Sequence, residues 1–156
     1  MPVVRIKQLL DESEMCDLTD VDSPERNLLN HGDIVFSWSG TLALRTWTRG
    51  PAILNQHLFR VVPKPGFETG WVKAVLEAAI PDLSKLTHGS TMKHITKPKL
   101  LNYKITIPDR AEQIWIAETF ERLQVLRSHL DHQVQDLSRL KSSLMSMMQE
   151  GAQNVR

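Results

Sequence analysis

A short basic segment in the middle of the chain has the residue types of a phosphate-binding site. Lys93, His94, Lys97 and Lys99 fall within seven residues. Lysine side chains neutralise phosphates whatever the base sequence, and Pro98 favours a turn-like course over a regular helix. The segment therefore predicts contact with a polyanion, and a solvated loop is the alternative interpretation.

A second group of polar side chains surrounds a predicted hairpin just after residue 32. It consists of small hydroxyls and two guanidinium groups: Ser37, Ser39, Thr41, Arg45 and Arg49. Hydroxyls donate to phosphates, and arginine suits bidentate contact with guanine. We expect these side chains to reach phosphates and base edges, although a plain hairpin without such a role would show the same residues. Because recognition loops vary in course, no single residue is assigned to a base.

Other reactive residue types do not form a recognisable catalytic or metal site. Asn55-Gln56-His57 precedes a predicted strand and has no supporting carboxylate or cysteine, so we expect a structural role. The six histidines form no HExxH pair, and the single Cys16 excludes an internal disulfide framework and a multi-cysteine zinc site. No phosphate-binding glycine loop or nucleophile motif occurs. We expect no enzyme activity, no cofactor and no metal.

The charge distribution along the 156 residues supports an anionic ligand for the middle of the chain only. The formal net charge is +1, which taken alone argues against nucleic acid. Residues 1–35 have three basic and eight acidic side chains (−5), residues 36–108 have ten and three (+7), and residues 109–156 have six and seven (−1). The basic excess is therefore concentrated where the two polar groups lie.

The elements that must position these groups are β-rich. Residues 33–38, 42–47 and 58–62 read as strands, separated by glycine and proline breaks. Thr69 should cap a helix that Pro81 ends, and residues 103–107 alternate as a last strand. With the long helix that follows, this predicts an α+β fold: a β-rich domain with short helices in residues 1–108.

The last third of the chain reads as one long helix over 109–150, with a flexible tail at 151–156. Asp109 and Glu112 have capping-box spacing after Pro108. Apolar residues then recur with a mean period of about 3.56 residues and form a stripe along the helix. This period lies between that of a coiled coil and that of a straight helix. The helix would be a rod of about 60 Å, and a partner helix must cover its apolar stripe. The predicted contact residues are Leu123, Leu126, Leu130, Val134, Leu137, Leu140, Leu144 and Met148.

Four motifs in this order resemble the specificity subunits of type I restriction-modification systems. They are residues 32–41, residues 54–60, residues 89–95, and Ile105 to Pro108 running into Glu112 and Gln113. The resemblance covers about residues 30–150 and looks like one target recognition domain with its spacer helix. It implies a non-catalytic, cytoplasmic protein that binds double-stranded DNA and directs a methyltransferase subunit, and in the full complex a restriction subunit, to a defined sequence.

The chain departs from the family pattern because a full specificity subunit resembles two recognition domains and two spacer helices. The chain resembles a half-subunit, with a domain abbreviated at its N-terminus. We expect a homodimer whose long helices pack antiparallel and which reads a palindromic, interrupted target. The alternative is an assembly protein that does not bind DNA and pairs through its helix with a specificity or methyltransferase subunit. No membrane association is expected, because no run of residues suits a membrane helix.

Overall fold

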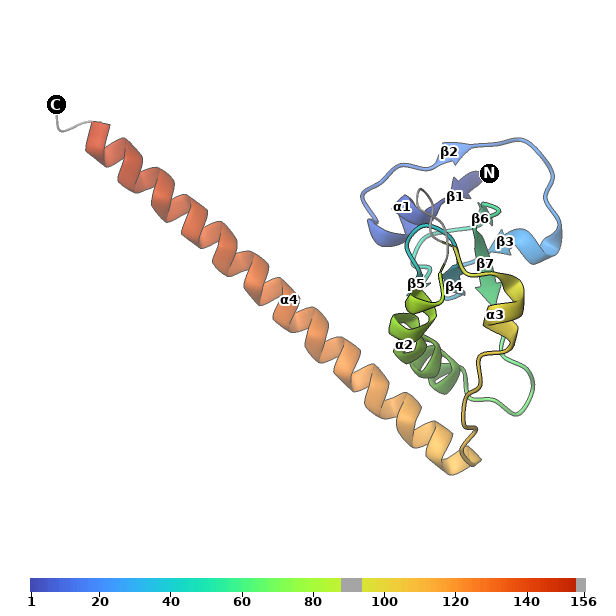
Figure 1. Cartoon of the computed structure of the whole chain (residues 1–156). Coiled ribbons are helices and arrows are strands. Elements are labelled where there is room, and N and C mark those ends of the chain that lie inside the picture. The colour runs from blue at the N-terminus through green and yellow to red at the C-terminus, as the bar shows by residue number, and fades with distance from the viewer. Residues whose placement is uncertain (88–93, 154–156) are drawn as a thin grey trace. The chain divides into compact units, whose positions relative to one another are not determined.

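The computed structural model describes residues 1–87 and 94–153 and divides into two compact units (Figure 1). Unit 1 is Met1–Ala117 and contains all the strands; unit 2 starts at Glu118 within the long helix. The architecture is α+β, as the sequence predicts. Unit 1 includes the first two turns of that helix, whereas the predicted boundary lies at 108/109. Within the described residues, no helix is long and apolar enough to cross a membrane.

The first sheet, of order β2-β1-β6-β3, collects short strands that are distant in sequence. β1 (Pro2–Val4) pairs with β2 (Asp17–Leu18) antiparallel and with β6 (Ala52–Leu54) in parallel, and β6 pairs with β3 (Leu28–Leu29) antiparallel. The short helix α1 (Ile6–Leu10) follows β1, and the 3-10 turn η1 (Glu25–Asn27) precedes β3. The N-terminal 30 residues therefore belong to the domain.

The second sheet, of order β5-β4-β7, confirms the three strands predicted between residues 33 and 62. β4 (Ile34–Ser37) lies in the centre and pairs antiparallel with β5 (Ala43–Thr46) and β7 (Leu58–Val61). Successive side chains of β4 point to opposite faces. Val35 belongs to a core with residues of the first sheet, whereas Ile34 and Phe36 belong to a core with α2. The second sheet is thus buried on both faces.

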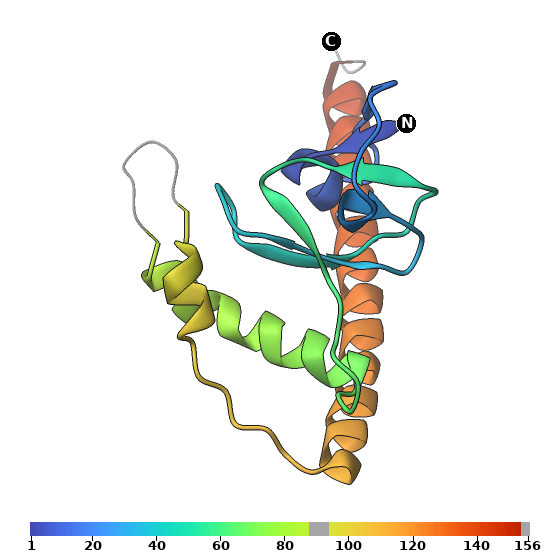
Figure 2. The same cartoon turned by 90° about the vertical axis from the view of Figure 1, so that its right-hand side faces the viewer.

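Helix α2 (Thr69–Lys85) continues four residues beyond Pro81, where the sequence predicted its end (Figure 2). Ala79 and Leu83 are both buried in the second core, so packing on either side of the proline maintains the helical course although one backbone hydrogen bond is lost. The predicted cap was also one residue too late, because Thr69 is the first helical residue and Glu68 occupies the cap.

Two further predictions after residue 93 were wrong. Pro98 was expected to prevent a helix, but it lies in the first turn of the short helix α3 (Lys97–Leu101). A proline is tolerated there because the backbone N–H groups of the first turn have no acceptor within the helix. Residues 103–107 form no strand; they pair with neither sheet, and Ile105 and Ile107 are exposed. The apolar alternation there does not reflect burial on one face of a sheet.

α4 (Arg110–Gln153) is a continuous helix of 44 residues, about 66 Å in length. Its start agrees with the predicted cap, since the Asp109 carboxylate accepts a hydrogen bond of 2.8 Å from the backbone N–H of Glu112. Its end lies beyond Gly151, so the first part of the predicted flexible tail is helical to Gln153.

Candidate nucleic-acid interface

The turn between β4 and β5 forms the first part of the candidate interface. Gly40 has a φ of +73°, a left-handed conformation that favours glycine, and Thr41 beside it is exposed. The tight connection returns the chain so that Ser37 lies opposite Ala43. The hydroxyl of Thr41 is therefore presented to solvent at the end of the second sheet.

The described start of the basic segment docks on this turn. Ser39 and His94 form an antiparallel bridge, and the Ile95 N–H donates to the Trp38 carbonyl at 3.2 Å. Ile95 is only 1% exposed and packs in the core between the second sheet and α2. The buried Ile95 thereby holds His94, which is exposed, next to Ser39, although more than 50 residues separate the two along the chain.

Trp38 connects the turn with a third segment, residues 55–57. Its backbone N–H donates to the His57 carbonyl and its indole N–H to the Gln56 carbonyl, both at 3.3 Å. The indole ring lies 5.8 Å from the His57 ring and 6.4 Å, edge-on, from the His94 ring. Trp38 therefore holds three loops together at one end of the sheet. The sequence placed it within a motif but gave no signal for this role.

The Asn55-Gln56-His57 turn has the geometry of a structural element, in line with its predicted role. The Asn55 side-chain oxygen accepts from the His57 N–H at 3.2 Å, and the Asn55 N–H donates to the Val4 carbonyl at 3.0 Å. These bonds fix the connection between β6 and β7 against β1. The Nδ1 atom of His57 is buried without a hydrogen-bond partner.

Two of the hydroxyls predicted to contact DNA are buried. Ser37 has no exposed surface, and its hydroxyl donates to the Ser39 carbonyl at 3.2 Å. Ser39 is 5% exposed and forms the bridge to His94. Both residues shape the turn from inside, and their side chains are too buried to contact DNA.

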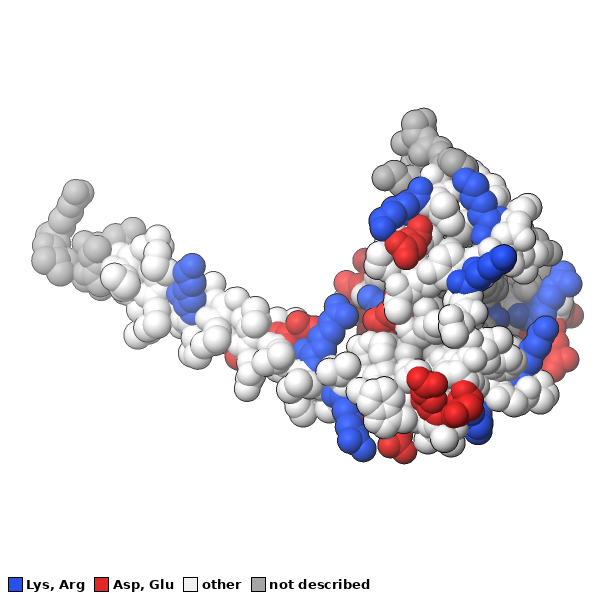
Figure 3. Space-filling view, turned by 60° about the horizontal axis from the view of Figure 1, so that its bottom comes forward, with Lys and Arg blue, Asp and Glu red and all other residues white. Residues whose placement is uncertain are grey.

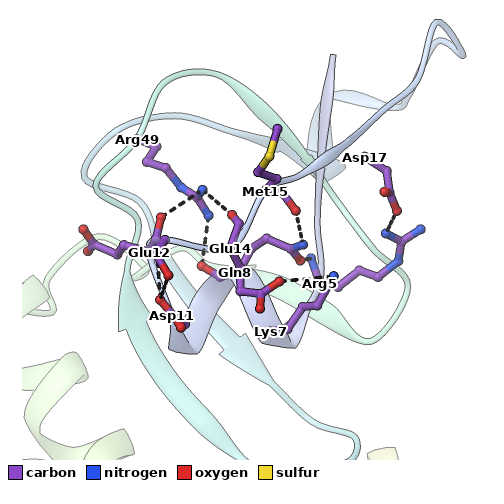
Figure 4. Close-up of polar contacts among 10 residues, drawn as sticks. Arg5, Lys7, Gln8, Asp11, Glu12, Glu14, Met15, Asp17 and Arg49 are labelled. Atoms are coloured by element: carbon purple, nitrogen blue, oxygen red, sulfur yellow. Dashed lines mark hydrogen bonds and ion pairs between the residues drawn. The ribbon is translucent and has the colours of Figure 1, made fainter.

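Arg49, also predicted to contact DNA, binds the N-terminal segment (Figure 4). Its guanidinium donates to the carbonyls of Gln8 and Glu14 at 3.0 Å and of Glu12 at 3.4 Å, and it stacks on the Trp47 ring at 4.5 Å. A group satisfied in this way holds residues 8–14 against the domain. The geometry therefore assigns Arg49 a structural role.

The other predicted contact residues differ in how far the structure describes them. Arg45 is exposed on the edge strand β5 and donates to the Leu44 carbonyl. Lys99 is half-buried, and its ammonium donates to the Leu86 carbonyl at the end of α2. Lys93 lies outside the described residues, and of Lys97 only the backbone, in the first turn of α3, is described.

The basic excess of the middle segment is distributed over unit 1 and is not gathered in one patch on the face that Figure 3 shows. Some of these cations are paired. Arg60 lies 3.5 Å from Asp33, and Lys85 donates to Asp82 at 2.8 Å, a hydrogen bond that raises the pKa of Lys85. In the described part of the chain Lys64, Lys73 and Lys104 make no ion pair.

A glutamine that the sequence placed only within a motif joins the domain to the first turns of α4. Gln113 is 4% exposed; its side-chain oxygen accepts from the Glu68 N–H at 2.9 Å and its amide donates to the Pro108 carbonyl at 3.0 Å. Arg110 pairs with the Glu68 carboxylate at 2.7 Å. A Cβ on Gly70 would meet the Ala117 Cβ at 2.7 Å, so the two helices touch where only glycine fits.

The apolar stripe of α4 in unit 2 is largely exposed to solvent. Each of its predicted contact residues is at least 53% exposed. They are Leu123, Leu126, Leu130, Val134, Leu137, Leu140, Leu144 and Met148. A run of this kind on one helix is typical of a helix–helix interface.

No group of three or more metal-ligating side chains that could hold an ion occurs among residues 1–87 and 94–153. The site is built instead from loops that a double-sided core holds in place, with exposed hydroxyl, imidazole and guanidinium groups. This arrangement suits binding to a polyanionic surface.

Comparisons with known proteins agree with a role in binding DNA. The model of the type I restriction modification DNA specificity domain matches residues 1–137. A chain in a solved structure concerned with complex assembly and conformational transition of the type I R-M system has a TM-score of 0.61 and 22% identity. The likeness covers 83% of this chain and 32% of that chain, so this chain spans about a third of its neighbour's length. No curated protein matches the chain.

The chain belongs to the type I restriction modification DNA specificity domain family. The resemblance found in the four sequence motifs is thereby confirmed, and the structural neighbour shows the same fold.

Proposed function

We propose that the protein recognises a specific sequence of double-stranded DNA and directs a methyltransferase subunit, and with it a restriction subunit, to that target. It has no catalytic role of its own. The observation that carries this proposal is the match to a DNA specificity domain over residues 1–137.

The proposed DNA-contacting surface is the end of the second sheet around Trp38. Thr41 and His94 are exposed there, and the described part of the basic segment starts at His94. Arg45 is exposed further along β5, opposite Val35, and we include it in the proposed surface. Arginine and threonine suit base edges and phosphates, and the lysines suit phosphates alone. Lys93, Lys97 and Lys99 are part of this proposal.

The protein acts as a homodimer whose α4 helices pack antiparallel through the exposed stripe. In the dimer two recognition units are related by a two-fold axis, so the target is an interrupted palindrome. The length of the paired helices sets the separation of the half-sites.

A second candidate function follows from the same stripe. An assembly protein would use α4 to pair with a specificity or methyltransferase subunit and would not bind DNA. The exposed leucines of α4 suit this function as well as they suit a homodimer.

Binding to random duplex DNA at increasing salt separates the two functions. For a DNA-binding protein, the logarithm of the binding constant falls linearly with the logarithm of the salt concentration, because binding releases counterions from the DNA. The Lys93→Ala, Lys97→Ala, Lys99→Ala triple variant should bind every sequence more weakly and with a flatter salt slope. An unchanged slope removes the basic segment from the interface, and absence of binding at low salt supports the assembly function.

A further inference from the structure

A cavity of about 350 Å³ opens on the N-terminal part of unit 1, and none of its lining residues belongs to the proposed DNA interface. Its walls are mostly apolar and come from β1, the segment through β2 and the loop after β5. The lining includes Pro2, Met15, Cys16, Leu18, Trp47 and Pro51. The volume accepts at least one large apolar side chain.

The rim of the cavity exposes more apolar surface than a free loop requires. Met15 is 85% exposed and Leu18 is 79% exposed, and Val21, a short distance along the chain, is 69% exposed. Three large apolar side chains within seven residues, beside an apolar cavity, are typical of a surface that another molecule covers.

The segment that carries these side chains is strongly acidic. Residues 8–25 contain seven carboxylates and no basic side chain. Asp17 pairs with Arg5 and Glu14 with Lys7, but Asp20 and Asp22 make no ion pair with any described residue. Hydrogen bonds from the side chain and backbone of Ser13 lower the pKa of Asp11, which keeps that carboxylate charged.

Only one cation lines the cavity, and it is turned inward. The guanidinium of Arg49 donates to three carbonyls of residues 8–14, as Figure 4 shows. It also stacks on the Trp47 ring. It holds the acidic segment in place, and its N–H groups are directed to that segment. The seven carboxylates of residues 8–25 outnumber this cation, so the charge at this face is negative.

We propose that this acidic apolar face is a docking site for a protein partner that presents a basic, amphipathic segment. One apolar side chain of the partner enters the cavity, and flanking Lys or Arg side chains face Asp20 and Asp22. The negative charge disfavours DNA and anionic membranes, and the apolar lining disfavours a purely ionic partner. This site is separate from the proposed DNA interface, and its existence does not depend on DNA binding.

Cys16 provides a direct reporter, because it is the single cysteine of the chain and lines the cavity. The test measures the rate at which N-ethylmaleimide alkylates Cys16 in the full chain. Three synthetic helical peptides of equal length serve as probes: one of Lys and Leu with the Leu on one face, one of Glu and Leu in the same pattern, and one of Lys and Ser. The Lys/Leu peptide should slow alkylation at least fivefold at saturation, and the other two should leave the rate within twofold.

Charge reversal tests Asp20 and Asp22, which follow the lining residue Leu18 by two and four positions along the chain. Asp20→Lys with Asp22→Lys should abolish the protection by the Lys/Leu peptide, because both residues are exposed and unpaired and their replacement leaves the fold intact. The matched control, Glu121→Lys with Asp136→Lys on α4, should keep it. Circular dichroism checks that each variant is folded.

Several results would overturn the proposal. They are protection by the Glu/Leu or the Lys/Ser peptide equal to that by the Lys/Leu peptide, no protection by any peptide, and protection that survives in the Asp20→Lys, Asp22→Lys variant. Protection by duplex DNA would assign the face to nucleic acid, and protection that grows with protein concentration alone would assign it to a second copy of the chain. A failure here leaves the salt-dependent DNA binding untouched, so the two proposals fail separately.

Discussion

At the scale of single residues, Arg45 and Arg49 show how position on a strand decides what an arginine does. The two lie four residues apart, yet Arg45 is exposed on the edge strand and Arg49 donates to three carbonyls of the N-terminal segment. An arginine whose two terminal nitrogens donate inside the domain has little left for a phosphate. The account therefore assigns DNA contact to Arg45 and stability to Arg49.

Replacing Arg45 by alanine should weaken DNA binding and reduce the steepness of its salt dependence by about one unit, because one phosphate contact is lost. Thermal stability should not change, since the side chain is exposed. Fluorescence anisotropy with a labelled duplex at several salt concentrations measures the slope. Arg26→Ala is the matched control, an exposed arginine directly after the acidic segment, and an equal effect in both variants would contradict the assignment.

Replacing Gln113 by alanine should lower the free energy of unfolding by about 1–3 kcal/mol, because the Glu68 N–H at the start of α2 loses its acceptor inside the domain. Urea denaturation followed by circular dichroism measures the change. Gln133→Ala, on the exposed part of α4, should change it by less than about 0.5 kcal/mol. A variant at Gln113 as stable as this control would show that the joint contributes nothing.

At the scale of elements, α4 carries the strongest expectation. Its apolar stripe is exposed over the whole of unit 2, and we propose that a second copy of the helix covers it. Leu130→Asp combined with Leu137→Asp should convert the dimer to a monomer in sedimentation velocity experiments, because two charges would be buried at the helix seam. Gln135→Asp, on the other side of the helix, should leave the dimer intact. A dimer that persists in the double variant would place the contact elsewhere.

Elements with strong local patterns could be predicted from the sequence, and elements that depend on distant partners could not. β4, β5, β7 and α4 follow their apolar periodicity and turn residues. β1 and β6, in contrast, are three residues each and exist because they pair across about 50 residues of chain. Propensity alone also misjudged the two prolines: Pro81 lies inside α2 because burial on both sides favours the helix, and Pro98 starts α3.

The sequence predicted the residue types of the candidate site, but not how the fold brings them together. The sequence indicated the hairpin and the basic segment, but only the Ser39–His94 bridge and the burial of Ile95 bring them together. The same geometry buries Ser37 and Ser39, which a pattern of hydroxyls cannot reveal. Trp38 and Gln113 act through contacts with residues far along the chain, so no local pattern marks them.

At the scale of the whole molecule, segments of different net charge have different proposed roles. The acidic N-terminal segment carries the proposed protein-docking face, the basic middle segment carries the proposed DNA interface, and the nearly neutral helix carries the pairing stripe. A net charge of +1 therefore conceals three segments of different charge, for which we propose different partners.

If the protein reads a DNA sequence, selection from a library of random duplexes will reveal its target. The purified chain is used to capture duplexes over several rounds at moderate salt. We expect enrichment of one target with two half-sites related as a palindrome and separated by a fixed number of unspecified base pairs. A recovered pool with the same sequence composition as the starting library would contradict it.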